Sequence, residues 1–132
     1  MSFKAQSEAV LYQSINSASL EGDVLEIDAD SAVGHEQRGR RPVLVVSVDA
    51  LHSALGLTMV CAMRTHGGRS TGARNDLEVP IPPGMAATGV VLPHQMRTID
   101  TRAPNATKLC TVPRATLQSV RARLKVLLGL GR

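Results

Sequence analysis

The sequence predicts a mainly β domain with two helices: a small, compact antiparallel barrel, one short helix and one long C-terminal helix. About six short apolar runs follow one another at close spacing, separated by stretches rich in Gly, Pro and Arg. A long apolar stripe at helical spacing occurs only near the C-terminus. The 132 residues, 43% apolar and 20% charged, suit one globular domain. We place that domain at residues 22–132 and expect residues 1–21, which are polar, to form a tail or short helix outside it.

The first two predicted strands flank a loop. Asp23–Asp28 has a polar/apolar rhythm that is consistent with a half-buried strand. Residues 31–41 hold two glycines and three arginines, which indicates an exposed loop. Pro42 suits the opening of a strand. Residues 43–46 are apolar at consecutive positions, which is typical of a strand covered on both faces.

The middle of the chain alternates helix, strands and loops. Residues 48–56 predict a short helix, with Asp49 placed to cap it and Gly56 to end it. Leu57–Met63 is expected to be a strand, and residues 64–75, with three glycines, three arginines and no acid, a loop. Further short strands are expected at 77–81, 88–92, 95–100 and 106–112.

The terminal helix is predicted from apolar residues that recur every three or four positions. Pro113 suits its first turn and Gly129 ends the run. The apolar stripe consists of Leu117, Val120, Leu124, Leu127 and Leu128.

The charges are divided unevenly along the chain. The net charge is +4, but residues 1–30 hold six acids and one base, so the remainder carries fourteen bases against five acids. Residues 108–132 hold six bases and no acid. A basic body of this kind favours a polyanion or an acidic protein as partner.

Composition excludes several classes of protein. No apolar run approaches the ~20 residues that a membrane-spanning helix needs, and the N-terminus lacks the apolar core of a signal peptide. Cys61 and Cys110 share no metal-ligand spacing, so we expect neither a disulfide scaffold nor a zinc site, and a reducing cytoplasm suits them. Phe3 and Tyr12 are the only aromatic residues, which argues against a base-stacking RNA module.

The densest group of reactive side chains lies in residues 34–42, GHEQRGRRP. It combines an imidazole, a carboxylate and three guanidiniums. RNA cleavage without a metal needs a base for the 2′-OH, an acid for the leaving oxygen and a cation for the phosphorane. The alternative interpretation is a solvated basic loop with a structural pair of glycines.

Three stretches resemble the MazF/PemK/Kid family of type II toxin–antitoxin toxins. They are GDVLEIDADSAVGHEQRGRRPVLVVS at 22–47, ATGVVLPHQMRTIDTRA at 87–103 and the helix VPRATLQSVRARLKVLLGL at 112–130. The resemblance implies an SH3-like barrel of the CcdB/PemK type and a homodimer. It also implies a cytoplasmic mRNA interferase, which is a sequence-specific endoribonuclease that cuts single-stranded RNA. Neither metal nor other cofactor is expected, and an acidic antitoxin protein is the implied partner.

The resemblance also indicates site residues. Arg41 matches the arginine before the proline, which stabilises the scissile phosphate; a strand-opening salt bridge is its alternative role. The catalytic candidates are Arg41, His35, Thr65 and His94, with the choice of general base left open. The RNA-binding candidates are Glu36, Gln37, Arg38, Arg40, Arg64, Arg69, Gln95 and Arg97.

Three positions depart from the family pattern. Arg64 stands where the catalytic threonine is expected, so either Thr65 takes over by a shift of one residue or the hydroxyl is lost. His94 replaces an aspartate that is proposed as base, and Leu92 replaces an arginine that assists it. His94 could accept a proton or be a plain surface histidine. A second hypothesis is therefore a catalytically degenerate relative that binds RNA or antitoxin without cutting.

Overall fold

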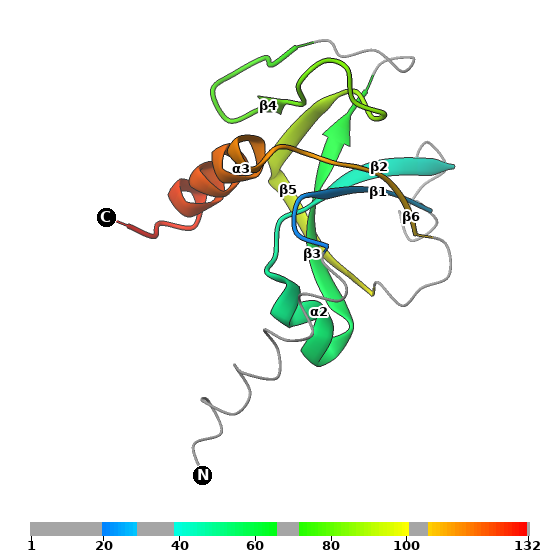
Figure 1. Ribbon diagram of the computed structural model, residues 1–132. Helices are drawn as coiled ribbons and strands as arrows, with labels where there is room; N and C mark the ends of the chain where they lie inside the picture. Colours follow the sequence, from blue (N-terminus) through cyan, green and yellow to red (C-terminus); the bar gives the residue numbers. More distant parts are fainter. Residues whose placement is uncertain (1–19, 29–38, 66–71, 101–105, 132) are drawn as a thin grey trace.

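The computed structural model describes residues 20–28, 39–65, 72–100 and 106–131, which form a six-stranded sheet and two helices (Figure 1). All strand pairs found in these residues are antiparallel, and the order across the sheet is β4-β5-β3-β2-β1-β6. The predicted mainly β class is confirmed. The strands are β1 (Asp23–Asp28), β2 (Arg40–Val45), β3 (Leu57–Arg64), β4 (Val79–Pro80), β5 (Val90–Asp100) and β6 (Thr107–Thr111). The helices are α2 (Asp49–Leu55) and α3 (Arg114–Leu127).

Strand β5 differs from the prediction, because one strand replaces the two expected at 88–92 and 95–100. Cys61 of β3 faces Met96, and the next residue, Ala62, faces Leu92. Residues 93–95 of β5 therefore fall between these pairs and form a bulge. Pro93 has no N–H for the ladder, which explains why the pairing is interrupted there.

Strand β2 supports both faces of the sheet, as its run of apolar residues predicts. Leu44, and Val46 just after the strand, belong to the core cluster beneath α3, whereas Val43 and Val45 belong to a second cluster on the other face. The side chains of a strand point alternately to the two faces, so consecutive apolar residues fill both. The second face, which we call the Val43 face, carries the site described below.

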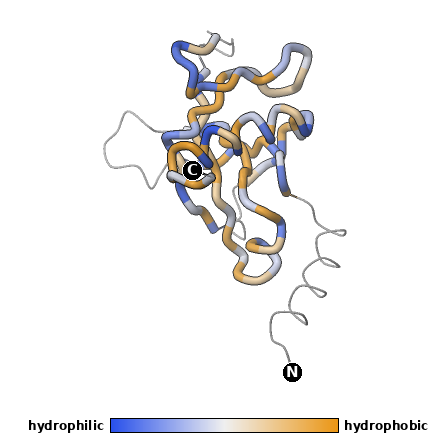
Figure 2. The backbone as a smooth tube through the Cα atoms, turned by 90° about the vertical axis from the view of Figure 1, so that its left-hand side faces the viewer, coloured by the Kyte–Doolittle hydropathy of each residue, from blue (hydrophilic) through white to orange (hydrophobic). Residues whose placement is uncertain are grey.

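Helix α3 packs on β5 and closes the first face (Figure 1). Leu117 and Val120 are buried in the cluster beneath it, and each such burial contributes about 1.5–3 kcal/mol. Gly129 adopts a φ of 72° just after the helix, which confirms the predicted end. The last part of the stripe is not buried, because Leu127 and Leu128 are 43% and 60% exposed. Figure 2 shows hydrophobic colour around the C-terminal end of the chain.

Helix α2 ends as predicted but begins differently. Gly56 has a φ of 68° and its N–H donates to the carbonyl oxygen of His52 at 2.7 Å. The expected cap by Asp49 is wrong, since Asp49 is the first residue of the helix and the N-cap residue is Val48, whose side chain makes no cap hydrogen bond. Asp49 is 2% exposed, and its Oδ1 instead accepts the backbone N–H groups of Leu20 at 2.7 Å and Glu21 at 2.8 Å. A buried carboxylate needs hydrogen-bond donors, and the fold brings it these two from a distant part of the chain. The residues next to Asp49 in the sequence give no sign of them.

Neither α2 nor α3, the helices of the described residues, has the length and apolar character that crossing a membrane requires.

Candidate functional site

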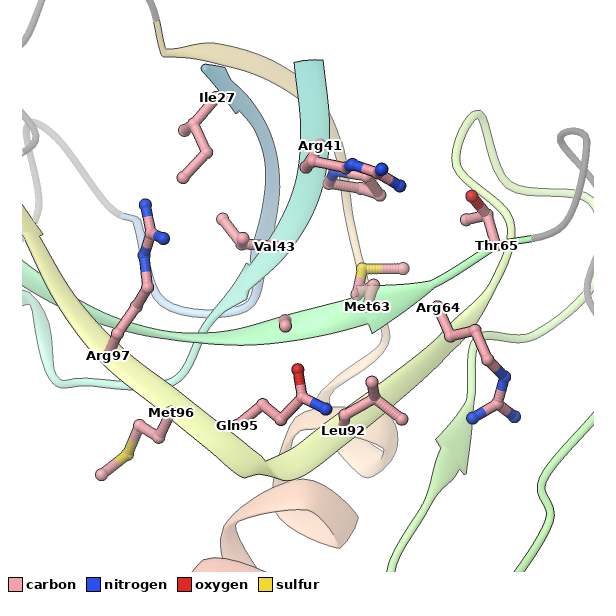
Figure 3. Close-up of a pocket in the computed structure, with 12 residues that line it drawn as sticks. Ile27, Arg41, Val43, Met63, Arg64, Thr65, Leu92, Gln95, Met96 and Arg97 are labelled. Atoms are coloured by element: carbon pink, nitrogen blue, oxygen red, sulfur yellow. The ribbon is translucent and has the colours of Figure 1, made fainter. Parts of the chain in front are cut away.

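A pocket of about 460 Å³ opens on the Val43 face of the sheet (Figure 3). Strands β1, β2, β3 and β5 all contribute to it, together with the residue that follows β3. We call it the sheet pocket. Its lining consists of Ile27, Arg41, Pro42, Val43, Ala62, Met63, Arg64, Thr65, Leu92, Gln95, Met96 and Arg97.

Arg41 reaches the sheet pocket because of its position on β2. It pairs with Ile27 of β1 and lies two residues before Val43, so the alternation of side chains places it on the Val43 face. Its side chain is exposed, and Figure 3 shows the guanidinium extending to the side on which Thr65 lies. Arg97, from β5 opposite Val60, stands on the other side of the pocket.

Arg40 takes the opposite direction. Its Nη2 donates to the backbone oxygen of Glu26 and to Oγ1 of Thr107, both at 2.8 Å. Its Nε lies 3.4 Å from Oε1 of Glu26, and its Nη1 lies 3.5 Å from Oδ1 of Asp28. The guanidinium thus joins β2 to β1 and β6, and Arg40 does not line the sheet pocket. Contact between Arg40 and RNA stays a prediction.

The bulge in β5 separates two of its three predicted site residues, His94 and Gln95. Gln95 lines the sheet pocket, and Figure 3 shows its amide pointing into it. His94, the preceding residue, is exposed and does not belong to the lining. A bulge changes the direction of side chains along a strand, so Gln95 can face the pocket while His94 faces solvent.

Arg64 borders the pocket but directs its guanidinium away from it (Figure 3). Its Nη1 and Nη2 donate to the two carboxylate oxygens of Glu78 at 2.9 and 2.8 Å, and Nη2 also donates to the carbonyl of Gly72 at 2.8 Å. The Glu78 carboxylate accepts the backbone N–H of Arg74 as well, at 2.8 Å. The hydrogen bond from Arg64, followed by that from Arg74, lowers the pKa of Glu78 to about 2.

Thr65 lies at the edge of the pocket, directly after β3 (Figure 3). Gly89 lies against this point of the chain. A Cβ atom on Gly89 would stand 2.7 Å from the carbonyl oxygen of Arg64 and 2.8 Å from Cγ2 of Thr65. With a φ of +139°, Gly89 also holds a backbone conformation that side chains oppose.

Several sequence candidates lie outside the described residues, and their roles stay predictions: His35, Glu36, Gln37, Arg38 and Arg69. Sequence reasoning missed Glu78 and the apolar lining of the pocket, including Met63 and Met96. Glu78 had a usable signal, because acids are rare in this basic part of the chain. The methionines had none. Among the described residues, no group of three or more His, Cys, Asp or Glu side chains is arranged to hold a metal ion.

The sheet pocket combines two kinds of contact. Arg41 and Arg97 offer guanidiniums, whose planar donors match phosphate oxygens. Gln95 offers an amide that can donate and accept, and Thr65 offers a hydroxyl. Between them lies an apolar floor that can pack against a ring or a sugar. A polymer in which phosphates alternate with sugars that carry rings fits this arrangement of guanidiniums around an apolar floor.

Comparison with known proteins identifies the family. Residues 20–128 match the model of a family described as "PemK-like, MazF-like toxin of type II toxin-antitoxin system". The chain is 34% identical over 109 residues to the endoribonuclease PemK of Escherichia coli, covering 81% of this chain and 80% of that protein. It is 33% identical over 110 residues to the endoribonuclease toxin MazF of Escherichia coli strain K12, covering 82% and 92%.

Solved structures agree with the sequence relatives. A crystal structure of MazF from Deinococcus radiodurans matches with a TM-score of 0.69 at 34% identity, over 83% of this chain and 96% of that one. A MazE-MazF structure from the same organism matches with a TM-score of 0.68 at 30% identity, over 84% and 95%. The chain belongs to the PemK-like, MazF-like family of toxins of type II toxin–antitoxin systems, as its motifs predict.

Proposed function

We propose that this protein is an endoribonuclease toxin that cuts single-stranded mRNA in the cytoplasm by attack of a ribose 2′-OH, without a metal ion. The observation that carries the proposal is the place of Arg41, whose guanidinium reaches a pocket that also holds Arg97, Gln95 and Thr65. The names of the relatives PemK and MazF, both endoribonucleases, support the reaction class.

In the proposed reaction, the 2′-oxygen attacks the adjacent phosphorus while a base takes its proton. The bond from phosphorus to the 5′-oxygen then breaks, and an acid protonates that oxygen. The products are a 2′,3′-cyclic phosphate and a 5′-OH. Arg41 binds the phosphate and neutralises the charge that grows on the phosphorane, and Thr65 adds a hydrogen bond.

The general base is His35 or His94. An imidazole nitrogen can accept the proton of a hydroxyl, so either side chain has the chemistry that the role requires. His94 is exposed within the bulge, next to Gln95 of the pocket, whereas His35 lies outside the described residues. Separate His35→Ala and His94→Ala variants distinguish them, since loss of the base lowers kcat by about 10²–10⁴-fold.

The test is the cleavage of single-stranded RNA by purified protein in EDTA, followed by mapping of the fragment ends. We expect ends that carry a cyclic phosphate and a 5′-OH. Arg41→Ala should abolish cutting, whereas Arg114→Ala, which removes an equal charge from an exposed position on α3, should keep it. Cleavage by Arg41→Ala at the wild-type rate would reject the role of Arg41.

An acidic antitoxin is the proposed protein partner. The family consists of toxins of toxin–antitoxin systems, and the fold matches a MazE-MazF structure. The excess of bases after residue 30 gives this partner a surface of opposite charge. Mixing with an acidic antitoxin protein should suppress cleavage, with a strength that falls as salt rises.

We extend the proposal to a homodimer. The end of the terminal helix exposes a group of apolar residues, of which Val126 and Leu128 are 71% and 60% exposed. Exposed apolar groups of this kind favour association. Light scattering should give twice the mass of one chain, and Val126→Asp should reduce it.

The second candidate function is binding without cleavage. The guanidinium of Arg64 is engaged by Glu78, and Leu92 offers no charge at a position where the family resemblance implies an arginine. Growth arrest after induction, with cellular RNA left intact, would favour this candidate over the nuclease.

A further inference from the structure

We propose that Arg64 is a positioning residue: its two-pronged ion pair with Glu78 holds the end of β3 so that Thr65 stays at the edge of the sheet pocket. This inference rests on the proposed function, since it gives Thr65 a reaction to serve. It also assigns Arg64 a role other than the RNA contact expected from the sequence.

The ion pair has the geometry of a fixed contact. Both guanidinium donors engage Glu78, one on each carboxylate oxygen, at 2.9 and 2.8 Å. The side chain of Arg64 is 17% exposed and that of Glu78 is 6% exposed. An ion pair that is shielded from water is weakened little by salt, and two parallel hydrogen bonds prevent the guanidinium from rotating.

The ion pair connects parts of the chain on both sides of Thr65. The carbonyl of Gly72 also accepts from Arg64, and the backbone N–H of Arg74 donates to Glu78. One guanidinium therefore binds the end of β3 to the segment 72–78 that leads into β4. Any movement of Arg64 must break contacts at Gly72 and Glu78 together.

Gly89 fixes the same point from another direction. It approaches so closely that a Cβ atom there would clash with the carbonyl of Arg64 and the methyl group of Thr65. The end of β3 is thus held on one side by Gly89, just before β5, and on the other by the ion pair. Thr65, between these two contacts, has little room to shift.

A direct role of Arg64 on phosphate would be costly in this structure. The guanidinium would have to leave both oxygens of Glu78 and the carbonyl of Gly72. Glu78 would then remain as a buried carboxylate without its ion-pair partner. The free energy lost by breaking such a buried pair exceeds the free energy gained from a new phosphate contact at the edge of the pocket. Arg41 and Arg97 already supply guanidiniums there.

The experiment measures kcat and KM separately for an RNA oligonucleotide in EDTA. Arg64→Gln and Glu78→Gln should each lower kcat by about ten- to a hundredfold, because a small displacement of a reacting group has effects of that size. KM and its dependence on salt should stay near the wild type. Asp76→Asn, which changes an exposed acid in the same segment, is the matched control and should leave kcat unchanged.

A double-mutant cycle tests whether Arg64 acts through Thr65. In a Thr65→Val background, Arg64→Gln should cause no further loss of kcat, since the group to be positioned is absent. Exchange of the charges, Arg64→Glu with Glu78→Arg, should restore part of kcat. If Arg64→Gln does not fold in a thermal melt, Arg64→Lys takes its place, because it keeps the charge and loses the second prong.

The outcomes separate this inference from the proposed function. A raised KM and a shallower salt dependence in Arg64→Gln, without a matching change in Glu78→Gln, would make Arg64 a phosphate ligand and overturn the inference. An unchanged kcat in both variants overturns it as well. Failure of the wild type to cut RNA overturns the proposed function and this inference together, whereas unaltered activity of Arg41→Ala counts only against the role of Arg41.

Discussion

Arg40 and Arg41 are neighbours in the chain, yet their guanidiniums serve opposite faces of strand β2. Arg41 lies on the Val43 face and lines the sheet pocket. Arg40 binds Glu26 and Thr107 and thereby ties β2 to β1 and β6. The period of two along a strand produces this division, so a sequence of consecutive arginines contains one candidate for the site and one for the scaffold.

The two arginines should therefore respond differently to removal. We expect Arg41→Ala to lower RNA cleavage by at least about a hundredfold, the loss typical of a group that stabilises developing negative charge. Arg40→Ala should instead lower the free energy of unfolding, by about 1 kcal/mol for partly exposed pairs. Cleavage rates and urea unfolding of both variants test this. Equal loss of cleavage in both, at equal stability, would contradict the division.

Gly89 should prove intolerant of a side chain. Gly89→Ala places a Cβ atom within 2.8 Å of Thr65 and 2.7 Å of the carbonyl of Arg64, at a φ of +139°. We expect a loss of about 1–3 kcal/mol in the free energy of unfolding, because both strain and the clash act in the same direction. Chemical denaturation measures it. Gly84→Ala is the control, since its φ is also positive but nothing lies within 4 Å; equal losses in both would show that strain alone matters.

The sequence predicts the helices and strands whose bounds depend on residues that are neighbours along the chain. Strand β1 has the predicted bounds, Asp23–Asp28, but it is buried on both faces rather than on one, because the adjacent Val24 and Leu25 belong to different core clusters. The short helix ends at Gly56 because the left-handed backbone conformation that closes the helix there favours glycine. The sequence shows the interruption at Pro93 but not that residues 90–100 form one strand, because that depends on pairing across the sheet, such as that of Ala62 with Leu92. Asp49 was misread as a cap for the same reason, as its partners lie 29 and 28 residues away.

The site was predicted in part by family resemblance and in part not at all. Of the sequence candidates, Arg41, Arg64, Thr65, Gln95 and Arg97 lie together around one pocket. Their grouping follows from the order of β2, β3 and β5 in the sheet, which a linear motif does not contain. Glu78 was missed although it is a rare acid in this basic part of the chain, because its role depends on Arg64, which lies 14 residues away.

The contribution of Glu78 to stability should depend on pH in a defined direction. Its carboxylate has a pKa of about 2 in the folded protein, whereas a glutamate in an unfolded chain titrates near ~4.3. The lowered pKa means that the ion pair stabilises the fold fully above pH ~5, and that this stabilisation falls as pH decreases toward 2. Urea unfolding of wild type and Glu78→Gln should therefore differ most at neutral pH and converge on acidification. Arg64→Gln should show the same convergence, and a difference that grows on acidification would contradict it.

Gln95 should influence which sequence is cut more than whether cutting occurs. Its amide points into the sheet pocket beside the apolar Leu92, where a base could lie. Among the described residues that line the pocket, Gln95 is the one with an amide side chain. An amide can read a base edge by donating and accepting at once, and the loss of one such hydrogen bond costs about 0.5–1.5 kcal/mol, or up to roughly tenfold in selectivity. We expect Gln95→Ala to broaden the cut sites found by mapping fragment ends of a mixed RNA, with a smaller change in the total rate. Arg97→Ala should instead slow cutting at all sites alike, because a guanidinium on phosphate carries no sequence information. An unchanged set of cut sites in Gln95→Ala would remove this residue from base recognition.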